Sequence, residues 1–494
     1  MSGEVAPGRP GNLTPEQEEK LRRLWQLVFQ VCGVAPAENG TAVAPSSAPA
    51  PETTSPAEKT PKKGRMSIFS RRGRKESDPV EPAAPAPSGP PPSVVLSPPK
   101  EGDHDKYGQT QHFYDTLASM TPESIRATIW SMVKHDHPDA LLLRFLRARK
   151  WDVEKALIMM ISTMSWRANE MKVDDDIMRN GDAAAVEAEK NATDPAEKRL
   201  GHDFLQQARI GKSFIHGVDK IGRPVCYVRV RLHKQGEQVE KSLERYTVYV
   251  IETCRYLLQP PIDTATIVFD MTGFSLANMD YTPVKFMIKC FEANYPESLG
   301  AVLVHKAPWV FQGIWKVIRG WLDPVVANKV HFTNNVKEMD EFIAVKQLPK
   351  ELEGEEDWEY HFVEPVPGEN DKMKDTTTRD RLLATREMLI KEFEDTTLQW
   401  TQHPDDEKAA EIKARRASLV TQLREDYWGL DPYLRARSFY DRTGVLLPGG
   451  KIDFYPKPAQ ETEKTVAELT NGVAAVKIAP VGAPAVETSA DDVD

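Results

Sequence analysis

The chain has little cysteine and lacks the motifs of common cofactor sites and catalytic centres. Its four cysteines, Cys32, Cys226, Cys254 and Cys290, form no CxxC pair, and no histidines cluster at metal-ligand spacing. This argues for a reducing compartment and against a disulfide framework or a zinc site. The sequence has no GxxxxGK[ST], GxGxxG or Gly-x-Ser-x-Gly motif, which disfavours a nucleotide-dependent enzyme or an α/β-hydrolase. We expect no metal and no cofactor.

Long apolar runs and an excess of positive charge are also missing. No uncharged apolar run approaches the ~18–20 residues of a membrane-spanning helix, and the most apolar stretch is interrupted by His305 and Lys306. The N-terminus, MSGEVAPGRPGN, has no apolar signal-peptide core. The net charge of −10 argues against a dedicated nucleic-acid binder. We expect a soluble, cytoplasmic protein that meets membranes only transiently.

The N-terminal third contains helical patterns separated by a long low-complexity stretch. Residues 13–34 predict a first helix, with Thr14 as its N-cap and Pro15 at its first position. Residues 35–108 are rich in Pro, Ala, Ser, Thr and Glu and nearly free of aromatic residues, which predicts a disordered insertion. Helical patterns resume over residues 109–172, the expected remainder of the same helical module.

The C-terminal part has a different composition. Residues 353–456 predict an extension that contains a helical hairpin, with helices over Arg379–Trp400 and Asp405–Trp428. Residues 457–494 are rich in Ala, Glu and Thr and predict a disordered tail.

Between these parts, short β-branched runs alternate with longer helical patterns. This alternation is typical of parallel strands joined by crossover helices, and therefore of an α/β fold. The predicted strands are Val225–Leu232, Ile267–Met271, Ala301–His305 and Val330–Thr333, and the predicted helices are Glu240–Leu258, Pro283–Asn294 and Trp309–Leu322.

The helix over Trp309–Leu322 is unusually apolar. Phe311, Ile314, Trp315, Ile318 and Leu322 form a helical stripe, and tryptophans at 309 and 321 add apolar bulk on its flanks. Such a helix is either an ordinary core helix or one that meets something apolar outside the fold.

Four motifs in the same order carry a resemblance to a known family. They are LLRFLRARKWDVEKA (Leu142–Ala156), DKIGRPV (Asp219–Val225), YPESLG (Tyr295–Gly300) and LDPVVANK (Leu322–Lys329). Together they resemble the CRAL-TRIO lipid-binding family, in its branch of fungal phosphatidylinositol-transfer proteins. The resemblance implies a helical N-terminal module and a mostly parallel sheet flanked by helices, with an apolar lipid cavity and a lipid-binding domain over residues 200–352.

In this family the helix that matches Trp309–Leu322 is a gate that opens at the membrane. A carrier must replace hydrocarbon with hydrocarbon, because exposing acyl chains to water costs about 0.8 kcal/mol per methylene. The resemblance implies these gate residues: Trp309, Phe311, Ile314, Trp315, Ile318, Trp321 and Leu322.

The resemblance also implies a site for a phosphoinositol headgroup. The matching residues are Arg149, Lys150, Asp219, Glu297 and Lys329. A threonine of the family pattern is Val326 here, which removes one hydroxyl contact. Each residue has a simpler alternative: the two basic residues could complement a helix dipole, Glu297 could cap or pair locally, and Lys329 could be solvated.

Family members that also carry phosphatidylcholine use two tyrosines and a Ser-x-Thr pair. The matching pocket residues here are Ile215, Cys226, Ser275 and Ala277, of which only the serine is retained. Because aromatic faces hold a trimethylammonium group, we predict that phosphatidylcholine is not a ligand. We expect a second, more hydrophobic lipid instead, such as a sterol or an isoprenoid hydrocarbon.

The insertion contains a basic cluster with apolar residues inside it. Its candidate membrane contacts are Lys62, Lys63, Arg65, Ile68, Phe69, Arg71, Arg72 and Arg74. Basic residues near an anionic bilayer contribute about 1 kcal/mol each. A nuclear-localisation-like patch and a merely solvated linker are the alternatives.

Three functions of different classes follow from these patterns. The first is a cytoplasmic carrier that exchanges phosphatidylinositol and another hydrophobic lipid between membranes. The second is a regulatory protein that presents phosphatidylinositol to a lipid kinase or another partner. The third, a hydrolase that uses Asp270, ranks lowest, because Asp270–Gly273 is more simply the turn after a central strand. The chain is not expected to be an enzyme.

Overall fold

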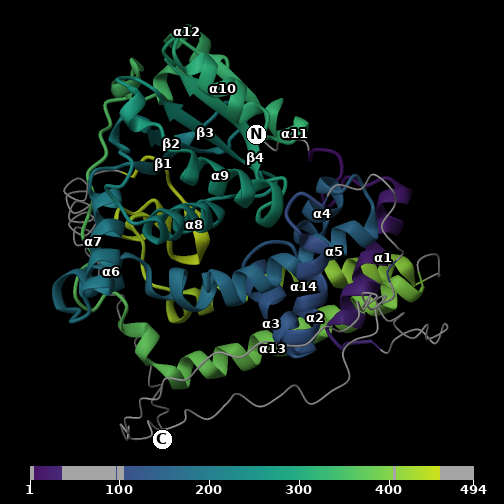
Figure 1. The fold of residues 1–494 in the computed structure, drawn as a ribbon. Coiled ribbons are helices and arrows are strands. Elements are labelled where there is room, and N and C mark those ends of the chain that lie inside the picture. Colours follow the sequence, from purple (N-terminus) through teal and green to yellow (C-terminus); the bar gives the residue numbers. More distant parts are fainter. Residues whose placement is uncertain (1–4, 36–95, 97–104, 404–407, 457–494) are drawn as a thin grey trace, which may run out of the picture. The chain divides into compact units, whose positions relative to one another are not determined.

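The computed structural model describes residues 5–35, 96, 105–403 and 408–456 (Figure 1). Most of the predicted insertion, including its basic cluster at residues 62–74, and the predicted tail 457–494 lie outside the described residues. The chain forms two compact units. The helical unit comprises Met1–Asp174, Lys289–Glu297 and Ala384–Tyr427, and the sheet unit comprises Asp175–Ile288, Ser298–Leu383 and Trp428–Asp494.

The helical unit begins with five helices, the first of which has the N-cap that the sequence predicts. Its N-terminal helices are α1 (Pro15–Val31), α2 (Gln109–Ser119), α3 (Pro122–Val133), α4 (Pro138–Ala148) and α5 (Val153–Ser165). Thr14 caps α1 through a reciprocal pair with Gln17, in which each backbone N–H donates to the other side chain. The predicted Thr14 cap is therefore confirmed.

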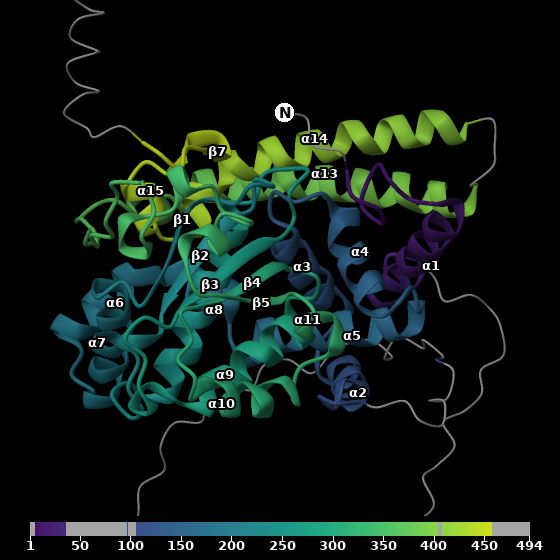
Figure 2. The same ribbon diagram turned by 90° about the horizontal axis from the view of Figure 1, so that it is seen from above.

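The C-terminal hairpin contributes to the core of this unit. Its helices are α13 (Thr376–Gln402) and α14 (Ala409–Leu434), which run side by side in Figure 2. Phe393 of α13 is fully buried, with its ring 5.8 Å from Trp25 of α1 and 5.9 Å from Trp130 of α3. Leu419 and Leu423 of α14 belong to the same cluster. The predicted hairpin exists, and its apolar side is buried among the N-terminal helices.

Buried ion pairs fix the hairpin in this core. Arg416 of α14 lies 2.6 Å from Asp139 of α4, and the indole of Trp25 donates to the same carboxylate at 2.7 Å. Arg126 of α3 donates to Glu394 of α13 at 2.8 Å. Removing one partner of such a pair leaves a buried, uncompensated charge, so these contacts specify the docking of the hairpin.

The sheet unit is built on five strands in the order β1-β2-β3-β4-β5. They are β1 (Ser213–Val218), β2 (Pro224–Arg229), β3 (Ala265–Asp270), β4 (Leu299–His305) and β5 (Val330–Thr333). Strands β2 to β5 are parallel, and β1 pairs antiparallel with β2. The strand predicted over Val225–Leu232 was expected to be the first of the sheet, but it corresponds to β2. Strand β1 was missed because its alternation is broken by a register shift around Gly217, whose φ is +64°.

Helices and short turns surround this sheet. They include α6 (Arg179–Asn191), α7 (Pro195–Arg209), α8 (Glu240–Tyr256), α9 (Tyr281–Lys289), α10 (Phe311–Arg319), α11 (Pro324–Ala327), α12 (Val336–Met339), α15 (Phe439–Arg442) and the ribbon β6 (Leu446–Leu447) with β7 (Lys451–Ile452). Helix α9 is shorter than the predicted Pro283–Asn294, because a π-helical turn, Cys290–Asn294, replaces its second half.

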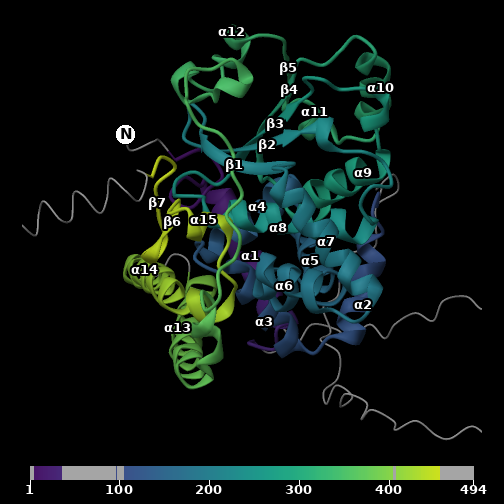
Figure 3. The ribbon, with the colours of Figure 1, turned by 90° about the vertical axis from the view of Figure 1, so that its left-hand side faces the viewer.

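The two faces of the sheet are covered by different parts of the chain. Val225, Val268 and Leu303 point to a face that packs against α12 and the segment as far as Leu352. Side chains alternate along a strand, so their neighbours point to the opposite face, where α10 packs on Val304. Figure 3 shows α10 and α12 on opposite sides of the sheet. We call the second face the α10 face.

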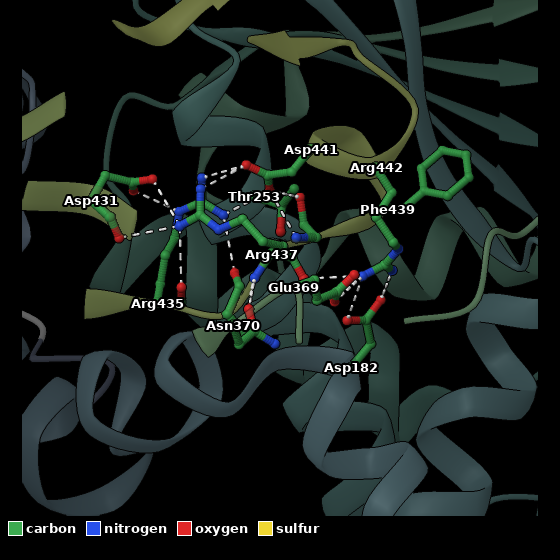
Figure 4. Close-up of polar contacts among 12 residues, drawn as sticks. Asp182, Thr253, Glu369, Asn370, Asp431, Arg435, Arg437, Phe439, Asp441 and Arg442 are labelled. Atoms are coloured by element: carbon green, nitrogen blue, oxygen red, sulfur yellow. Dashed lines mark hydrogen bonds and ion pairs between the residues drawn. The ribbon is translucent and has the colours of Figure 1, made fainter. Parts of the chain in front are cut away.

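A buried ion network holds residues 431–442 against other parts of the sheet unit (Figure 4). Its members are Arg435, Arg437, Arg442, Asp431, Asp441, Asp182 and Glu369. Arg435 Nε lies 2.7 Å from Asp431 Oδ1. Burial tends to raise the pKa of the Asp441 carboxyl, but the Arg435 guanidinium outweighs it and holds that pKa well below its usual range. Because Asp182 belongs to α6, the network ties residues 428–442 to a distant helix.

Within the described part of the chain, no helix is long and apolar enough to cross a membrane.

A candidate lipid-binding face

Two rows of apolar side chains cross the sheet on the α10 face. In the strand register, the first row is Ile215, Cys226, Ile267, Val302 and Val330, and the second is Val228, Phe269, Val304 and Phe332. Burial raises the pKa of the Cys226 thiol, so this side chain stays neutral and behaves as a small apolar group. The nine residues of these rows therefore carry no charge and no hydroxyl, and the second row ends at β2 because its position on β1 is Ser213.

The side chains of the described residues do not fully cover this face. Phe269 lies on the central strand, where side chains are normally buried, yet it is only half-buried. Phe332 is half-buried as well. Helix α9, which packs over the same face through Val284 and Ile288, has no fully buried residue. A half-covered apolar surface over a sheet is a common property of sites for hydrophobic ligands.

Helix α10 covers the β4–β5 side of this face. Phe311, Ile314 and Ile318 are buried in a cluster with Met271 and Val304. The Phe311 ring lies 5.8 Å from that of Phe274, and the Trp315 ring lies 5.4 Å from that of Phe332. These contacts are aromatic and aliphatic, without hydrogen bonds, so the same helix surface could exchange this partner for another apolar one at little cost in polar contacts.

The regular helix is shorter than predicted. It starts at Phe311, whose N–H donates to the Pro308 carbonyl, and ends at Arg319, with Gly320 as its C-cap. Trp309 therefore precedes the helix, and Trp321 and Leu322 follow it. Trp309 is 87% exposed, whereas the Trp321 ring lies 5.2 Å from Tyr281 of α9. The predicted gate residues thus comprise three buried side chains (Phe311, Ile314, Ile318), three half-buried ones (Trp315, Trp321, Leu322) and the exposed Trp309.

The outer surface of α10 is both apolar and basic. Trp309, Val317, Lys316 and Arg319 are all exposed. The sequence from Lys306 to Leu322 contains three basic residues and no acidic one. Lys306 pairs with Glu353. The exposed Trp309 beside the exposed Lys316 and Arg319 is the combination that anionic membrane interfaces attract.

The five predicted headgroup residues divide between the two units. Arg149, Lys150 and Glu297 belong to the helical unit, and Asp219 and Lys329 belong to the sheet unit. Their role in binding a headgroup stays a prediction.

In the helical unit, the two basic residues follow α4. Arg149 Nη2 donates to Gln109 Oε1 at 2.5 Å, whereas Lys150 is exposed. Glu297 is half-buried with φ +54°, and its carbonyl accepts a hydrogen bond from Arg144 Nη1 at 2.8 Å. Of the three, Lys150 is exposed and Glu297 half-buried, while Arg149 is turned toward the Gln109 side chain.

In the sheet unit, Asp219 orders the DKIGRP turn. Its Oδ1 accepts from the N–H groups of Ile221 and Arg223, both at 2.9 Å, and its Oδ2 accepts from Thr266 Oγ1 at 2.7 Å. The carboxylate is buried among these donors. Lys329 follows α11, where its carbonyl accepts from Val302 N–H at 2.8 Å, and its side chain is half-buried.

The predicted pocket residues separate into two groups. Ile215 and Cys226 are cross-strand neighbours on the α10 face. Ser275 and Ala277 lie instead in an exposed turn after β3, where Ser275 Oγ donates to Asn278 Oδ1 at 2.9 Å. Val326 is half-buried on α11.

The polar residues that suggested catalysis have structural partners. Asp270 pairs with Arg231 and accepts from Thr272 N–H at 3.0 Å. His305 lies 3.0 Å from Thr333 Oγ1, and burial lowers its pKa. Ser275, Asp270 and His305 do not form a hydrogen-bonded triad among the described contacts.

Sequence reasoning overlooked a buried lysine before β1. Lys212 is 7% exposed, and its Nζ donates to Gln238 Oε1 at 2.9 Å. Gln238 in turn donates to Gln206 at 3.0 Å. Burial lowers the pKa of Lys212 to about 8. A lone lysine in a polar loop has no sequence signal that predicts its burial.

We expect Lys212→Met to remove a pH dependence of stability. The pKa of Lys212 is about 8 in the folded protein against an ordinary value of 10.5. Between these two values the unfolded chain binds more protons at Lys212 than the folded protein does, so the free energy of unfolding rises with pH. The slope is ~1.4 kcal/mol per pH unit, and the total rise is about 3 kcal/mol. Urea unfolding of the wild type, of Lys212→Met and of a control at exposed Lys241 across that range measures this. If the free energy of unfolding depended equally on pH in all three proteins, Lys212 would not be the source of that dependence.

Comparison with known proteins agrees with the motifs. The CRAL/TRIO domain model matches residues 208–354, and the CRAL/TRIO N-terminal domain model matches residues 109–162. A CRAL-TRIO domain-containing protein of Schizosaccharomyces pombe is 41% identical over 89% of this chain and 93% of its own length. Phosphatidylinositol transfer protein CSR1 of Eremothecium gossypii is 40% identical over 90% of this chain and 100% of its own length.

A more distant match is the phosphatidylinositol/phosphatidylcholine transfer protein SFH7 of Arabidopsis thaliana, 28% identical over 41% of this chain and 36% of its own length. The predicted α/β fold, with a helical N-terminal region, a mostly parallel sheet and a C-terminal helix pair, is confirmed. The chain is homologous to lipid-transfer proteins and belongs to the non-enzymatic CRAL-TRIO family.

Proposed function

We propose that the protein exchanges phosphatidylinositol and a second, more hydrophobic lipid between membranes. The observation that carries this proposal is the half-covered apolar α10 face, on which a central-strand phenylalanine, Phe269, remains partly exposed. The homologue CSR1 is a phosphatidylinositol transfer protein by name, which supports the same function here.

In this mechanism the acyl chains lie on the α10 face and α10 is the gate. In the closed state, the buried side of α10 packs on Met271 and Val304. Open at a membrane, the same side would contact bilayer hydrocarbon, so the apolar contacts are exchanged and not lost. The exposed Trp309, with Lys316 and Arg319, would lead this contact at an anionic surface. The basic cluster at residues 62–74 would be a further membrane contact.

The headgroup is assigned to charged groups at the polar end of the lipid. In the helical unit, Glu297 would accept from inositol hydroxyls and Lys150 would face the phosphate. In the sheet unit, Lys329 stays a proposed headgroup residue. The internal contacts of Arg149 and Asp219 favour indirect roles for these two. Ile215 and Cys226 in place of tyrosines make a phosphatidylcholine site unfavourable. A sterol or an isoprenoid hydrocarbon fits the apolar rows better.

The test is mass spectrometry of the lipids extracted from natively purified protein, compared with a Glu297→Ala, Lys329→Ala double variant. Each lost contact to a charged group costs about 1.5–3 kcal/mol, so two together should reduce bound phosphatidylinositol by at least about a hundredfold. We expect about one phosphatidylinositol per wild-type chain.

The matched control removes one positive and one negative charge elsewhere. Lys337 and Glu341 are both exposed in the sheet unit, and Lys337→Ala with Glu341→Ala should leave bound phosphatidylinositol unchanged. If a sterol or hydrocarbon comes off wild type and double variant equally, with no phosphoinositide, the headgroup site is refuted.

Presentation of phosphatidylinositol to a lipid kinase is the second candidate function. Its docking elements would be the insertion over residues 35–108 and the C-terminal hairpin. The apolar side of the hairpin is buried in the helical unit, which favours the carrier. Transfer between vesicles by the purified protein alone would support the carrier. Stimulation of a phosphatidylinositol kinase without any such transfer would support the regulator.

A further inference from the structure

The segment that carries Glu297 is held at its start by two side chains that immediately precede α2. Glu292 lies in the π-helical turn Cys290–Asn294, and its side chain is only 6% exposed. Tyr107 Oη donates to Glu292 Oε2 at 2.6 Å, and Lys106 Nζ lies 2.5 Å from the same oxygen. Because both donors converge on one buried carboxylate, this contact fixes the turn five residues before Glu297.

The middle of the segment is held through its backbone. The carbonyl of Ala293 accepts from Thr163 Oγ1 at 3.1 Å and from Gln109 Nε2 at 3.4 Å. Gln109 is in turn oriented by Arg149, whose Nη2 donates to its Oε1 at 2.5 Å. Arg149 therefore acts on this segment through Gln109.

The end of the segment is held as well. The Tyr295 ring packs edge-on against Trp166 at 5.7 Å, and Arg144 binds the Glu297 carbonyl. Glu297 has a φ of +54°, a conformation that is unfavourable for a residue other than glycine and that persists only where the surroundings hold it. All of these contacts lie within the helical unit.

We infer that Tyr107, Lys106 and Arg149 are positioning residues that hold Glu297 in place, and that they thereby set the preference for an inositol headgroup. This inference rests on the proposed function, in which Glu297 accepts from the headgroup. Hydrogen bonds from inositol hydroxyls depend on where the carboxylate stands, whereas a headgroup-free lipid makes no such contact. Loss of the Tyr107–Glu292 contact should therefore affect one cargo and not the other.

The experiment compares Tyr107→Phe with Tyr114→Phe, a control on α2 whose side chain is 49% exposed. In Tyr107→Phe we expect faster amide hydrogen exchange over residues 293–297 and about a tenfold fall in bound phosphatidylinositol relative to the second lipid. Tyr114→Phe should match the wild type in hydrogen exchange over residues 293–297 and in bound phosphatidylinositol. Adding Glu292→Gln to Tyr107→Phe should cause a further loss, because it also removes the ion pair with Lys106.

Two results would overturn the inference. One is a Tyr107→Phe protein with wild-type exchange over residues 293–297 and a wild-type share of phosphatidylinositol. The other is a proportional loss of every lipid together with a lower melting temperature, which would make Tyr107 merely structural. If the wild type carries no phosphoinositide, the proposed function fails, and the exchange measurement, which needs no lipid, still decides whether Tyr107 holds the segment.

Discussion

Replacing Phe393 by alanine is expected to lower the free energy of unfolding by about 3–5 kcal/mol. Phe393 lies in the C-terminal hairpin but is fully buried against Trp25 and Trp130, and the Arg416 guanidinium stands 5.0 Å from its ring centre. Truncation leaves a cavity among these large, rigid side chains, which cannot collapse to fill it. Urea unfolding followed by far-ultraviolet circular dichroism measures the change.

The same helix offers a matched control. Met388 of α13 is 67% exposed, and Met388→Ala should change the free energy of unfolding by no more than about 0.5 kcal/mol. If Phe393→Ala were as mild as this control, the hairpin would be an accessory to the helical unit and not a part of its core. It would then again be a candidate docking element for a partner.

Replacing Ile318 by aspartate is expected to displace α10 from the sheet. Ile318 is 8% exposed in the cluster with Met271 and Val304. An ionised carboxylate cannot be buried there without a cost of several kcal/mol, and a nine-residue helix has little stability of its own to resist displacement. The opposite face of the sheet keeps its separate core, so the rest of the sheet unit should remain folded.

The neighbouring residue provides the control for this prediction. Val317 is on the same helix and 45% exposed, so Val317→Asp should leave α10 in place. We expect rapid proteolysis between residues 306 and 324, and loss of bound lipid, in Ile318→Asp alone. Equal protection of α10 in the two variants would show that its packing on the α10 face is not what holds it closed. Weaker binding of Val317→Asp to anionic vesicles would add support for the outer surface as the membrane contact.

Much of the fold could be predicted because its signals are local. The β-branched run at Val330–Thr333 is a strand with those same bounds, and Thr14 caps α1 by accepting from Gln17 N–H at 3.2 Å. Hydrophobic periodicity and capping depend on residues a few positions apart. Strand β1 was missed for the same reason, since its local alternation is interrupted at Gly217.

The candidate site was predicted less completely, because side-chain partners are chosen over long sequence distances. Ile215 and Cys226 do lie together on one face. Asp219, in contrast, is occupied by backbone N–H groups of its own turn and by Thr266, and Arg149 is turned to Gln109. A motif assigns a residue type to a position. The hydrogen-bond partner of that residue depends on which neighbours folding brings within about 3 Å.

The order of elements, the apolar character of Trp309–Leu322 and the family motifs could all be read from the chain, because each is a property of neighbouring residues. Three features required the folded protein. The hairpin is joined to α4 by Arg416 and Asp139, 277 residues apart, and Asp182 meets Arg442 across 260 residues. The third is the contact of Tyr107 with Glu292. Such pairs have no sequence signature, since their geometry arises only when separate helices and strands have already packed.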